Sequence, residues 1–144
     1  EPPRDPNPAR WATAFVRWLD TQPGVDSDTR ELALYLGMRL RVDQSPEADW
    51  EHGLQPGALL HFFVCDPRPL LFGRARSGAR RAVTLAVYRS ECGHVIDSAV
   101  ALEAIAAWGV ATGEADRDAL LAAGLDDRGI ARGLEALRDR GLYR

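Results

Sequence analysis

The stretch from Ala58 to Ile96 constrains the fold most, because its apolar runs are short and are separated by proline, glycine and arginine. Residues 58–65 are apolar on both alternating faces, which predicts a strand that is covered on both sides and is therefore central in a sheet. Asp66-Pro-Arg-Pro69 interrupts strand pairing, because proline lacks the amide donor and fixes its own backbone angle. We expect a second strand at 70–72, directly after this turn.

A third strand is predicted over residues 81–89, where Val83, Leu85 and Val87 alternate with Ala, Thr and Tyr. After a glycine break, residues 94–96 form either a short fourth strand or the lead into a helix. The whole stretch therefore predicts an antiparallel meander of three or four strands.

An arginine-rich hairpin tip is predicted between the second and third strands. The pair Ser77-Gly78 is typical of a turn. Four arginines, which are costly to bury, flank this pair: Arg74, Arg76, Arg80 and Arg81. From Arg68 to Arg89 there are six arginines and no acidic residue. A protruding basic turn suits contact with a phosphate backbone, with an affinity that falls steeply as salt rises.

An acidic segment is the alternative partner of this hairpin, on its own chain or on a neighbouring one. Its acidic residues are Asp43, Glu47, Asp49 and Glu51, in a stretch without arginine from Val42 to Val64. Pairing between chains makes an oligomer. A protein partner or self-association therefore stays open beside nucleic acid.

A helix is predicted near the amino terminus, where Asn7-Pro8 is a favourable start and Pro23-Gly24 a stop. Trp11, Phe15 and Trp18 fall on one face of this helix. We expect this face to pack into the core, with a partner-binding face as the alternative.

A second helix is expected from Asp28 to residue 41, with Glu31 as the partner in a capping box. Its apolar residues run almost all the way round. This pattern predicts burial between the first helix and the sheet.

Three helices are expected after the sheet. Asp97-Ser98 are expected to cap a helix from Ala99 to Trp108. Residues 116–143 then indicate two short helices, with Ala123 and Gly133 as small residues where the two touch. The second of them turns three apolar side chains inward: Ile130, Leu134 and Leu137.

Residues 99–143 resemble the helix-turn-helix half of winged-helix domains, through the tight turn at Gly124, Leu125 after it and the closing Arg-Gly-Leu-Tyr. In DNA-reading members the second helix begins with residues that meet phosphates and bases, whereas here it begins with Asp126-Asp127. The resemblance implies DNA contact through Arg128 and Arg132, or else a structural or protein-contact role. The excess of acids favours the second role, because eight acids face six arginines from Glu103 onward.

Length and composition bound the class of protein. With 144 residues, 46% of them hydrophobic, the chain is long enough for a single globular domain, which we place at 9–144. Within it we expect a helical pair at 9–41, the sheet at 58–96 and a helical bundle at 98–144. The proline-rich residues 1–8 begin with Glu rather than Met and are expected to be a linker or tail of a longer or processed chain.

The source and location are indicated by composition. No apolar run approaches the roughly 20 residues that span a bilayer, so no membrane contact is expected. Cys65 and Cys92 form at most one disulfide, which favours a reducing, intracellular compartment: the cytoplasm, or the nucleus for a virus or eukaryote. All eighteen basic residues are arginine, which indicates a GC-rich genome.

A candidate metal site consists of His61, Cys65, Cys92 and His94. His61 and Cys65 point to one face of the predicted strand, and two sulfurs with two imidazoles suit a tetrahedral zinc ion. The spacing matches no familiar zinc motif, and buried cysteines and hydrogen-bonded histidines are common in ordinary cores. We therefore expect no metal and keep zinc as the alternative.

No catalytic motif is found: neither a phosphate-binding glycine loop nor a Gly-x-Ser-x-Gly elbow occurs. We expect no catalytic residue and no cofactor.

The net charge of −3 means that nucleic-acid contact depends on a local patch. The hypothesis is an α+β, regulatory binding module that contacts nucleic acid through the hairpin arginines, with Arg128 and Arg132. The alternative is a protein-interaction or homodimer-forming domain, and a small zinc or thiol enzyme is less favoured.

Overall fold

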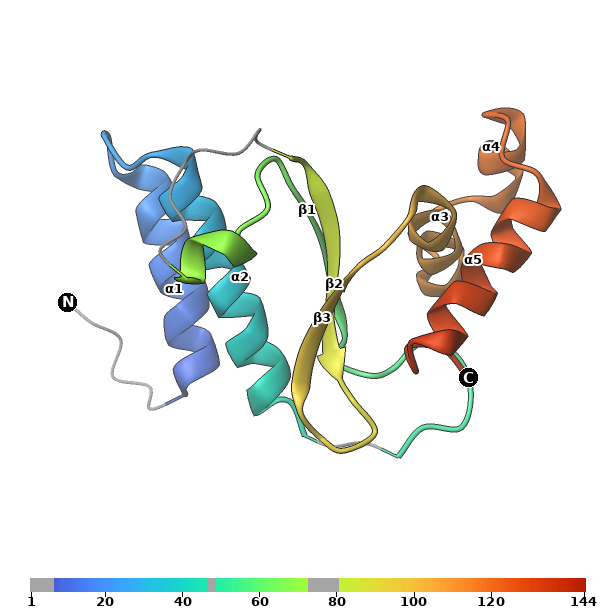
Figure 1. Ribbon diagram of the computed structural model, residues 1–144, viewed down its shortest axis with the longest axis horizontal. Coiled ribbons are helices and arrows are strands. Elements are labelled where there is room, and N and C mark those ends of the chain that lie inside the picture. The colour runs from blue at the N-terminus through green and yellow to red at the C-terminus, as the bar shows by residue number, and fades with distance from the viewer. Residues whose placement is uncertain (1–6, 47–48, 73–80) are drawn as a thin grey trace.

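A computed structural model of the protein describes residues 7–46, 49–72 and 81–144. It has a mixed helix and sheet structure in which a three-stranded antiparallel sheet stands between two groups of helices. Figure 1 shows α1 and α2 on one side of the sheet and α3, α4 and α5 on the other.

The sheet consists of β1 (Leu59–Phe63), β2 (Val83–Arg89) and β3 (Val95–Ala99), in the order β1-β2-β3. The expectation that 58–65 forms the central strand is wrong, because β1 lies at an edge and β2 lies between its two neighbours. Four successive residues of β2, Leu85 to Tyr88, are buried. Apolar residues on both faces of β1 were therefore no sign of a central position, which requires a pairing partner on each side.

The predicted second strand at 70–72 is also wrong, because these residues end a 3-10 helix, η1 (Arg68–Phe72). The Asp66 carboxylate accepts the Arg68 main-chain N–H at 3.0 Å, and the Leu70 N–H donates to the Pro67 carbonyl at 3.1 Å. These local bonds close turns and compete with an extended backbone.

The last strand continues further than the sequence indicated. Asp97-Ser98, expected to cap a helix, lie inside β3, where Ser98 stands opposite Ala86 of β2. α3 (Leu102–Thr112) consequently starts later, after Ala101, which makes no capping bond through its side chain. β3 therefore extends through residues 97–98 because pairing with the available edge of β2 satisfies the backbone hydrogen-bonding groups of these residues.

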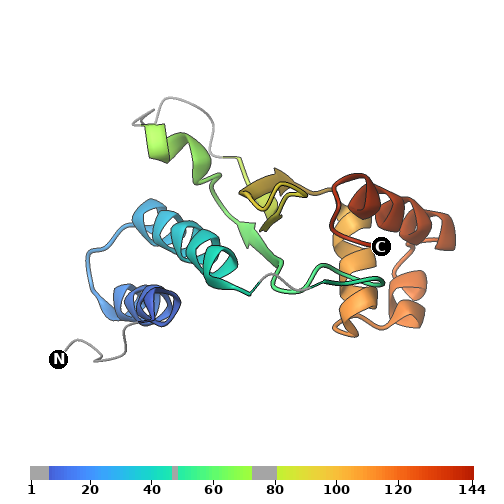
Figure 2. The same cartoon turned by 90° about the horizontal axis from the view of Figure 1, so that it is seen from below.

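The amino-terminal helices are α1 (Pro8–Thr21) and α2 (Ser27–Gln44). The cap of α2 is Asp26, whose carboxylate accepts the Thr29 N–H at 2.9 Å, so the predicted capping box at Asp28 and Glu31 is wrong. As predicted, α2 lies between α1 and the sheet (Figure 2).

Glu31 has a different partner because α2 runs alongside the end of β1. Its two carboxylate oxygens accept the main-chain N–H groups of Val64 and Cys65 at 2.8 and 2.7 Å. These bonds tie the helix to the end of an edge strand.

Two apolar cores form on the two faces of β2, because successive side chains of a strand point to opposite sides. Leu85 and Val87 pack with Tyr35, Met38 and Val42 of α2. Ala86 and Tyr88 pack on the other face with residues of the carboxy-terminal helices and the segments that flank them, among them Val100, Trp108, Ile130, Leu137 and Leu142.

The carboxy-terminal helices α4 (Arg117–Ala122) and α5 (Asp127–Asp139) follow α3. Gly133 does not mark a contact between α4 and α5, as expected, but the place where α5 crosses α3. A Cβ atom at Gly133 would lie 2.1 Å from the Glu103 carbonyl oxygen and 2.9 Å from the Ala107 Cβ. The two backbones can come this close only because the side chain is absent.

We therefore expect Gly133→Ala to lower the free energy of unfolding by about 1–3 kcal/mol, since the added methyl group pushes two helices apart. Gly37→Ala is the matched control: its Cβ would meet Ala12 and Val16 at 3.6 and 3.7 Å, an ordinary contact distance. Alanine there should be neutral or stabilising by about 1 kcal/mol, through its higher helix propensity. Urea unfolding checks both values, and equal effects of the two variants would contradict the close crossing.

Candidate functional site

The arginines singled out from the sequence fall into two groups. Arg74, Arg76 and Arg80 lie outside the described residues. Arg81 is exposed just before β2, and Arg128 and Arg132 are exposed on α5.

The described arginines on α5 are not all available to a polyanion. Arg132 donates to Glu103 of α3 at 2.6 Å, and this bond lowers the pKa of the Glu103 carboxyl. Asp127, at the start of α5, likewise forms an ion pair with Arg117 at 2.7 Å. The exposed side of α5 therefore carries paired charges of both signs, unlike a surface built for phosphate.

The four candidate zinc ligands do not come together. His61 stands opposite Leu85 in the sheet, and Cys65 follows the end of β1 beyond the pair Phe63 and Val83. Cys92 and His94 belong to the turn between β2 and β3, at the other end of the sheet. Within the ranges 7–46, 49–72 and 81–144, no group of three or more His, Cys, Asp or Glu side chains is placed to hold a metal ion.

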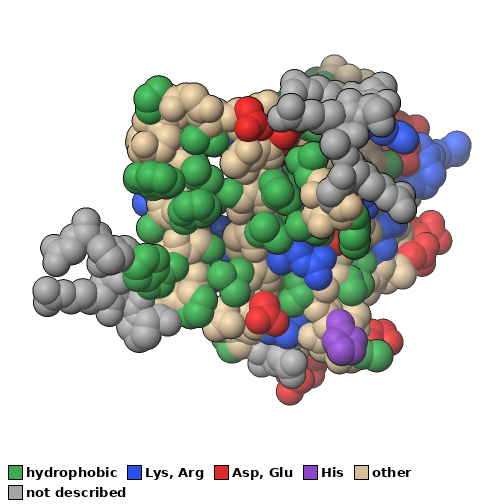
Figure 3. Space-filling view, turned by 60° about the vertical axis from the view of Figure 1, so that its left-hand side comes forward, with side chains coloured by type: hydrophobic (Ala, Val, Ile, Leu, Met, Phe, Trp, Pro, Cys, Tyr) green, Lys and Arg blue, Asp and Glu red, His purple; other side chains and the backbone are tan. Residues whose placement is uncertain are grey.

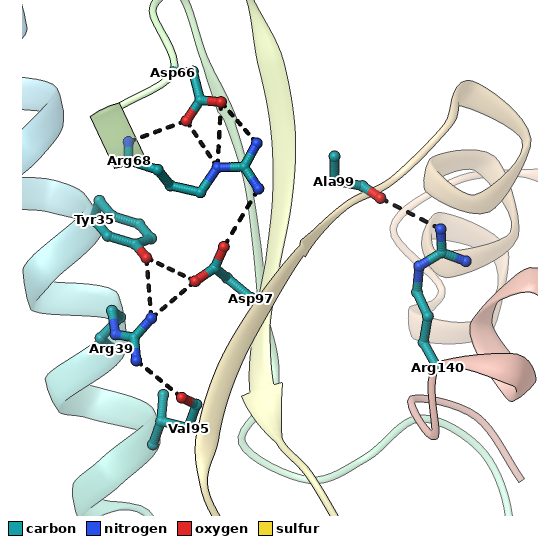
Figure 4. A network of polar contacts seen from close by, with 8 residues as sticks. All are labelled: Tyr35, Arg39, Asp66, Arg68, Val95, Asp97, Ala99 and Arg140. Carbon is teal, nitrogen blue, oxygen red and sulfur yellow. Dashed lines mark hydrogen bonds and ion pairs between the residues drawn. The ribbon is translucent and has the colours of Figure 1, made fainter. Parts of the chain in front are cut away.

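A network of polar side chains missed by the sequence analysis joins α2, β3 and η1 (Figure 4). The Tyr35 hydroxyl donates to an Asp97 carboxylate oxygen at 2.7 Å. Arg39 donates to the same oxygen at 2.8 Å and to the Val95 carbonyl at 2.9 Å. Burial raises the pKa of Tyr35, and its bond to Asp97 adds to this effect. Tyr35 is therefore a neutral donor over the physiological pH range.

Arg68 extends the network to η1. Its guanidinium lies 3.5 Å from the second oxygen of Asp97 and 2.7 Å from Asp66. The Arg68 hydrogen bonds lower the pKa of the Asp66 carboxyl. Two arginines thus balance two carboxylates, and the network anchors α2 to the sheet instead of offering a free base or nucleophile.

The helix that packs on α2 presents an unexpected apolar surface. α1 packs on α2 through Ala12 and Val16, which lie beside Gly37, and through the buried Leu19. Trp11, Phe15 and Trp18 remain 39%, 51% and 53% exposed. The expectation that this stripe packs into the core is wrong, because α2 separates α1 from the sheet (Figure 2).

These three aromatic residues form what we call the aromatic face, and Leu36 of the neighbouring α2 is also 45% exposed. The Phe15 and Trp18 rings stack with centroids 5.8 Å apart, and Trp11 and Phe15 line one shallow hollow with Leu40. Figure 3 shows hydrophobic side chains gathered over this side of the molecule. The pattern of Trp11, Phe15 and Trp18 was visible in the sequence, but their exposure was not.

Among the described residues of α1, no charged side chain lies on the aromatic stripe. Helical spacing turns Arg10, Arg17 and Asp20 to other sides of α1. The face therefore suits an apolar partner surface and offers nothing to a polyanion.

Comparison with known proteins adds no assignment, since neither a protein-family model nor a curated protein matches this chain. Over the described part of the chain, no helix combines the length and the apolar character needed to cross a membrane.

The lowered pKa of Asp66 predicts how stability changes with acid. A carboxyl whose pKa is lower in the folded state stabilises the protein above its unfolded pKa of about 3.9, and this contribution is lost as pH falls through the folded pKa. Asp66→Asn should therefore lower the free energy of unfolding by about 1 kcal/mol at pH 7, a modest value because the Asp66–Arg68 pair is partly exposed. The difference in the free energy of unfolding between the variant and the wild type should disappear below about pH 4.

Urea unfolding of both proteins from neutral to acidic pH measures this gap. Asp139→Asn, which removes one carboxylate from an exposed helix end, serves as the control. A gap that stays constant with pH would show that Asp66 does not stabilise the fold through its charge.

Proposed function

We propose that this protein is a non-catalytic protein-interaction module that associates with a second copy of itself through the aromatic face. The exposure of Trp11, Phe15 and Trp18 on one helix carries this proposal. Exposed aromatic side chains grouped on one surface mark interaction sites, and tryptophan is enriched among the residues that dominate binding energy.

A second copy is the partner that fits this face best. Aromatic side chains bury about 150–250 Å² each, so three rings about half exposed offer roughly 300 Å² per copy. A standard interface buries about 800 Å² per partner, with an apolar centre and a polar rim. The aromatic face has the size of such a centre, and two uncharged faces meet about a two-fold axis without repulsion between like charges.

Self-association should therefore depend on Phe15 and Trp18. Replacing both by alanine should weaken dimer formation at least thirtyfold, which corresponds to about 2 kcal/mol, the loss expected at the centre of an interface. The change in molar mass with concentration, measured by analytical ultracentrifugation, reports this effect.

Leu102→Ala is the control, because Leu102 is 73% exposed but lies on α3, on the other side of the sheet. A wild-type protein that stays monomeric at high micromolar concentration, or equal weakening by the control, would refute the proposal.

Nucleic-acid binding is the second candidate, and the local positive charge of residues 68–89 favours it. The sequence from Arg68 to Arg89 has six arginines and no acidic residue, and the described Arg81 is exposed. The helices at 102–139 follow one another as in helix-turn-helix domains, but their paired charges support a structural role for them. This candidate therefore depends on Arg74, Arg76, Arg80 and Arg81, and on Arg128 of α5 as a further contact.

Binding to duplex and single-stranded DNA and to RNA at several salt concentrations tests this candidate. The variant Arg80→Ala/Arg81→Ala should bind more weakly and should reduce the slope of log affinity against log salt by about 2, because each arginine would neutralise one phosphate. Arg10→Ala/Arg17→Ala removes the same charge from α1 and should have little effect. Absence of salt-sensitive binding, or equal weakening in the two variants, would exclude the arginine-rich segment before β2 as the binding surface.

A further inference from the structure

The peptide groups of β2 alternate between its two neighbouring strands. Thr84 accepts the Val100 N–H at 3.0 Å, on the side of β3. Arg89, an odd number of residues away, bonds through its main chain to the Gln55 side chain at 2.9 Å, on the side of β1. The odd-numbered residues of β2 therefore direct their N–H and carbonyl groups toward β1, as expected for an antiparallel pair.

Every second residue of β1 consequently directs its peptide groups away from β2. Leu60 and Phe62 stand opposite even-numbered residues of β2, so their N–H and carbonyl groups point to the open side of the sheet. There the described residues supply no hydrogen-bond partner for them. The Val64 N–H points the same way, but the Glu31 carboxylate accepts it at 2.8 Å. We call the unpaired groups of Leu60 and Phe62 the β1 edge.

The opposite edge of the sheet is covered by arginine side chains. The outward carbonyl of Val95 in β3 accepts a hydrogen bond from Arg39 at 2.9 Å, and Arg140 lies 3.5 Å from that of Ala99. Unpaired strand edges template pairing with another chain, and natural proteins usually cover them. The β1 edge is therefore the place where the described sheet can accept another strand.

One side of the β1 edge is apolar. Leu60 packs into the core below the carboxy-terminal helices, and Phe62 and Val64 point to the same face because side chains alternate along a strand. Phe62 and Val64 remain 58% and 65% exposed. An added strand would place every second side chain on this face, where apolar ones would cover these two residues.

The other side of the β1 edge is basic. Arg41 of α2 lines a hollow of about 290 Å³ with Leu59, at the start of β1, and another of about 350 Å³ with Arg17 of α1. Both arginines are exposed, and neither has a carboxylate within 4.0 Å among the described residues. The remaining side chains of an added strand would therefore meet positive charge.

We propose that the β1 edge binds an extended acidic peptide of a partner protein, which adds an antiparallel fourth strand to the sheet. Its main chain bonds to Leu60 and Phe62, as in other cases of strand addition. Its apolar side chains cover Phe62 and Val64, whereas its acidic ones face Arg41. β1 of a second copy fits less well, since its sequence contains no acid. The β1 edge shares no residue with the aromatic face, so the inference does not depend on self-association.

The probe is a seven-residue peptide of alternating glutamate and valine. Two matched peptides are the controls. The first has lysine in place of glutamate, and the second carries N-methyl groups on the valines, whose N–H groups would face β1. Calorimetry measures affinity, and amide hydrogen exchange measured by NMR shows which N–H groups the peptide protects.

In the free protein, the Leu60 and Phe62 amides should exchange faster than the His61 and Phe63 amides, which are bonded to β2. At saturation the acidic peptide should slow exchange of the Leu60 and Phe62 amides at least tenfold. The lysine peptide and the N-methylated peptide should each bind at least tenfold more weakly than the acidic peptide.

Variants of the protein separate main-chain pairing from charge. Phe62→Pro removes one outward donor without touching a bond to β2, so it should weaken binding at least tenfold. Phe62→Ala keeps this donor and should weaken binding less. Arg41→Glu should weaken binding of the acidic peptide at least fivefold and strengthen that of the lysine peptide, whereas Arg128→Glu, on α5, should change neither. Circular dichroism verifies that each variant is folded.

Absence of binding of the acidic peptide at about 1 mM would overturn the proposal. Binding that leaves exchange of the Leu60 and Phe62 amides unchanged, or that is equally strong for the N-methylated peptide, would also overturn it, because the peptide would then occupy another place. Protection of these amides that rises with protein concentration in the absence of peptide would assign the edge to a second copy and contradict the proposal as well.

Discussion

The burial of β2 on both faces is the constraint on which the rest of the structure depends. Leu85 and Val87 have no exposed surface on the side of α2, and Ala86 has none on the side of α3 and α5. A fully buried Leu or Val side chain contributes about 1.5–3 kcal/mol, so each helical layer gains its position by covering one face of this strand. The order β1-β2-β3 follows, since only a strand paired on both sides is shielded in this way.

Polar contacts then determine the orientation of the layers. Asp97 of β3 receives bonds from Tyr35 and Arg39 of α2, and Glu31 of α2 accepts two amides beyond β1. The helix is thereby tied to both edges of the sheet, while its buried side chains contact the centre. Because α2 lies between α1 and the sheet, α1 packs on α2, and its aromatic stripe stays exposed.

The aromatic face is apolar area that stays exposed after the core is complete. Association with a second copy would remove this area from water.

The sequence by itself predicted a mixed helix and sheet structure, the presence of five α-helices in the described chain and the strand at 83–89, because helical and alternating periodicities are local properties of the chain. It did not predict that β1 is an edge strand or that Asp97 belongs to β3, because each depends on which partner is within reach. It also did not predict that 70–72 end a 3-10 helix, which local bonds to Asp66 and Pro67 favour. The exposure of Trp11, Phe15 and Trp18 and the contact of Trp50 with Arg144 were decided only by the tertiary structure. The sequence gives the type of each side chain, but its burial and its neighbours are set by residues that are distant along the chain.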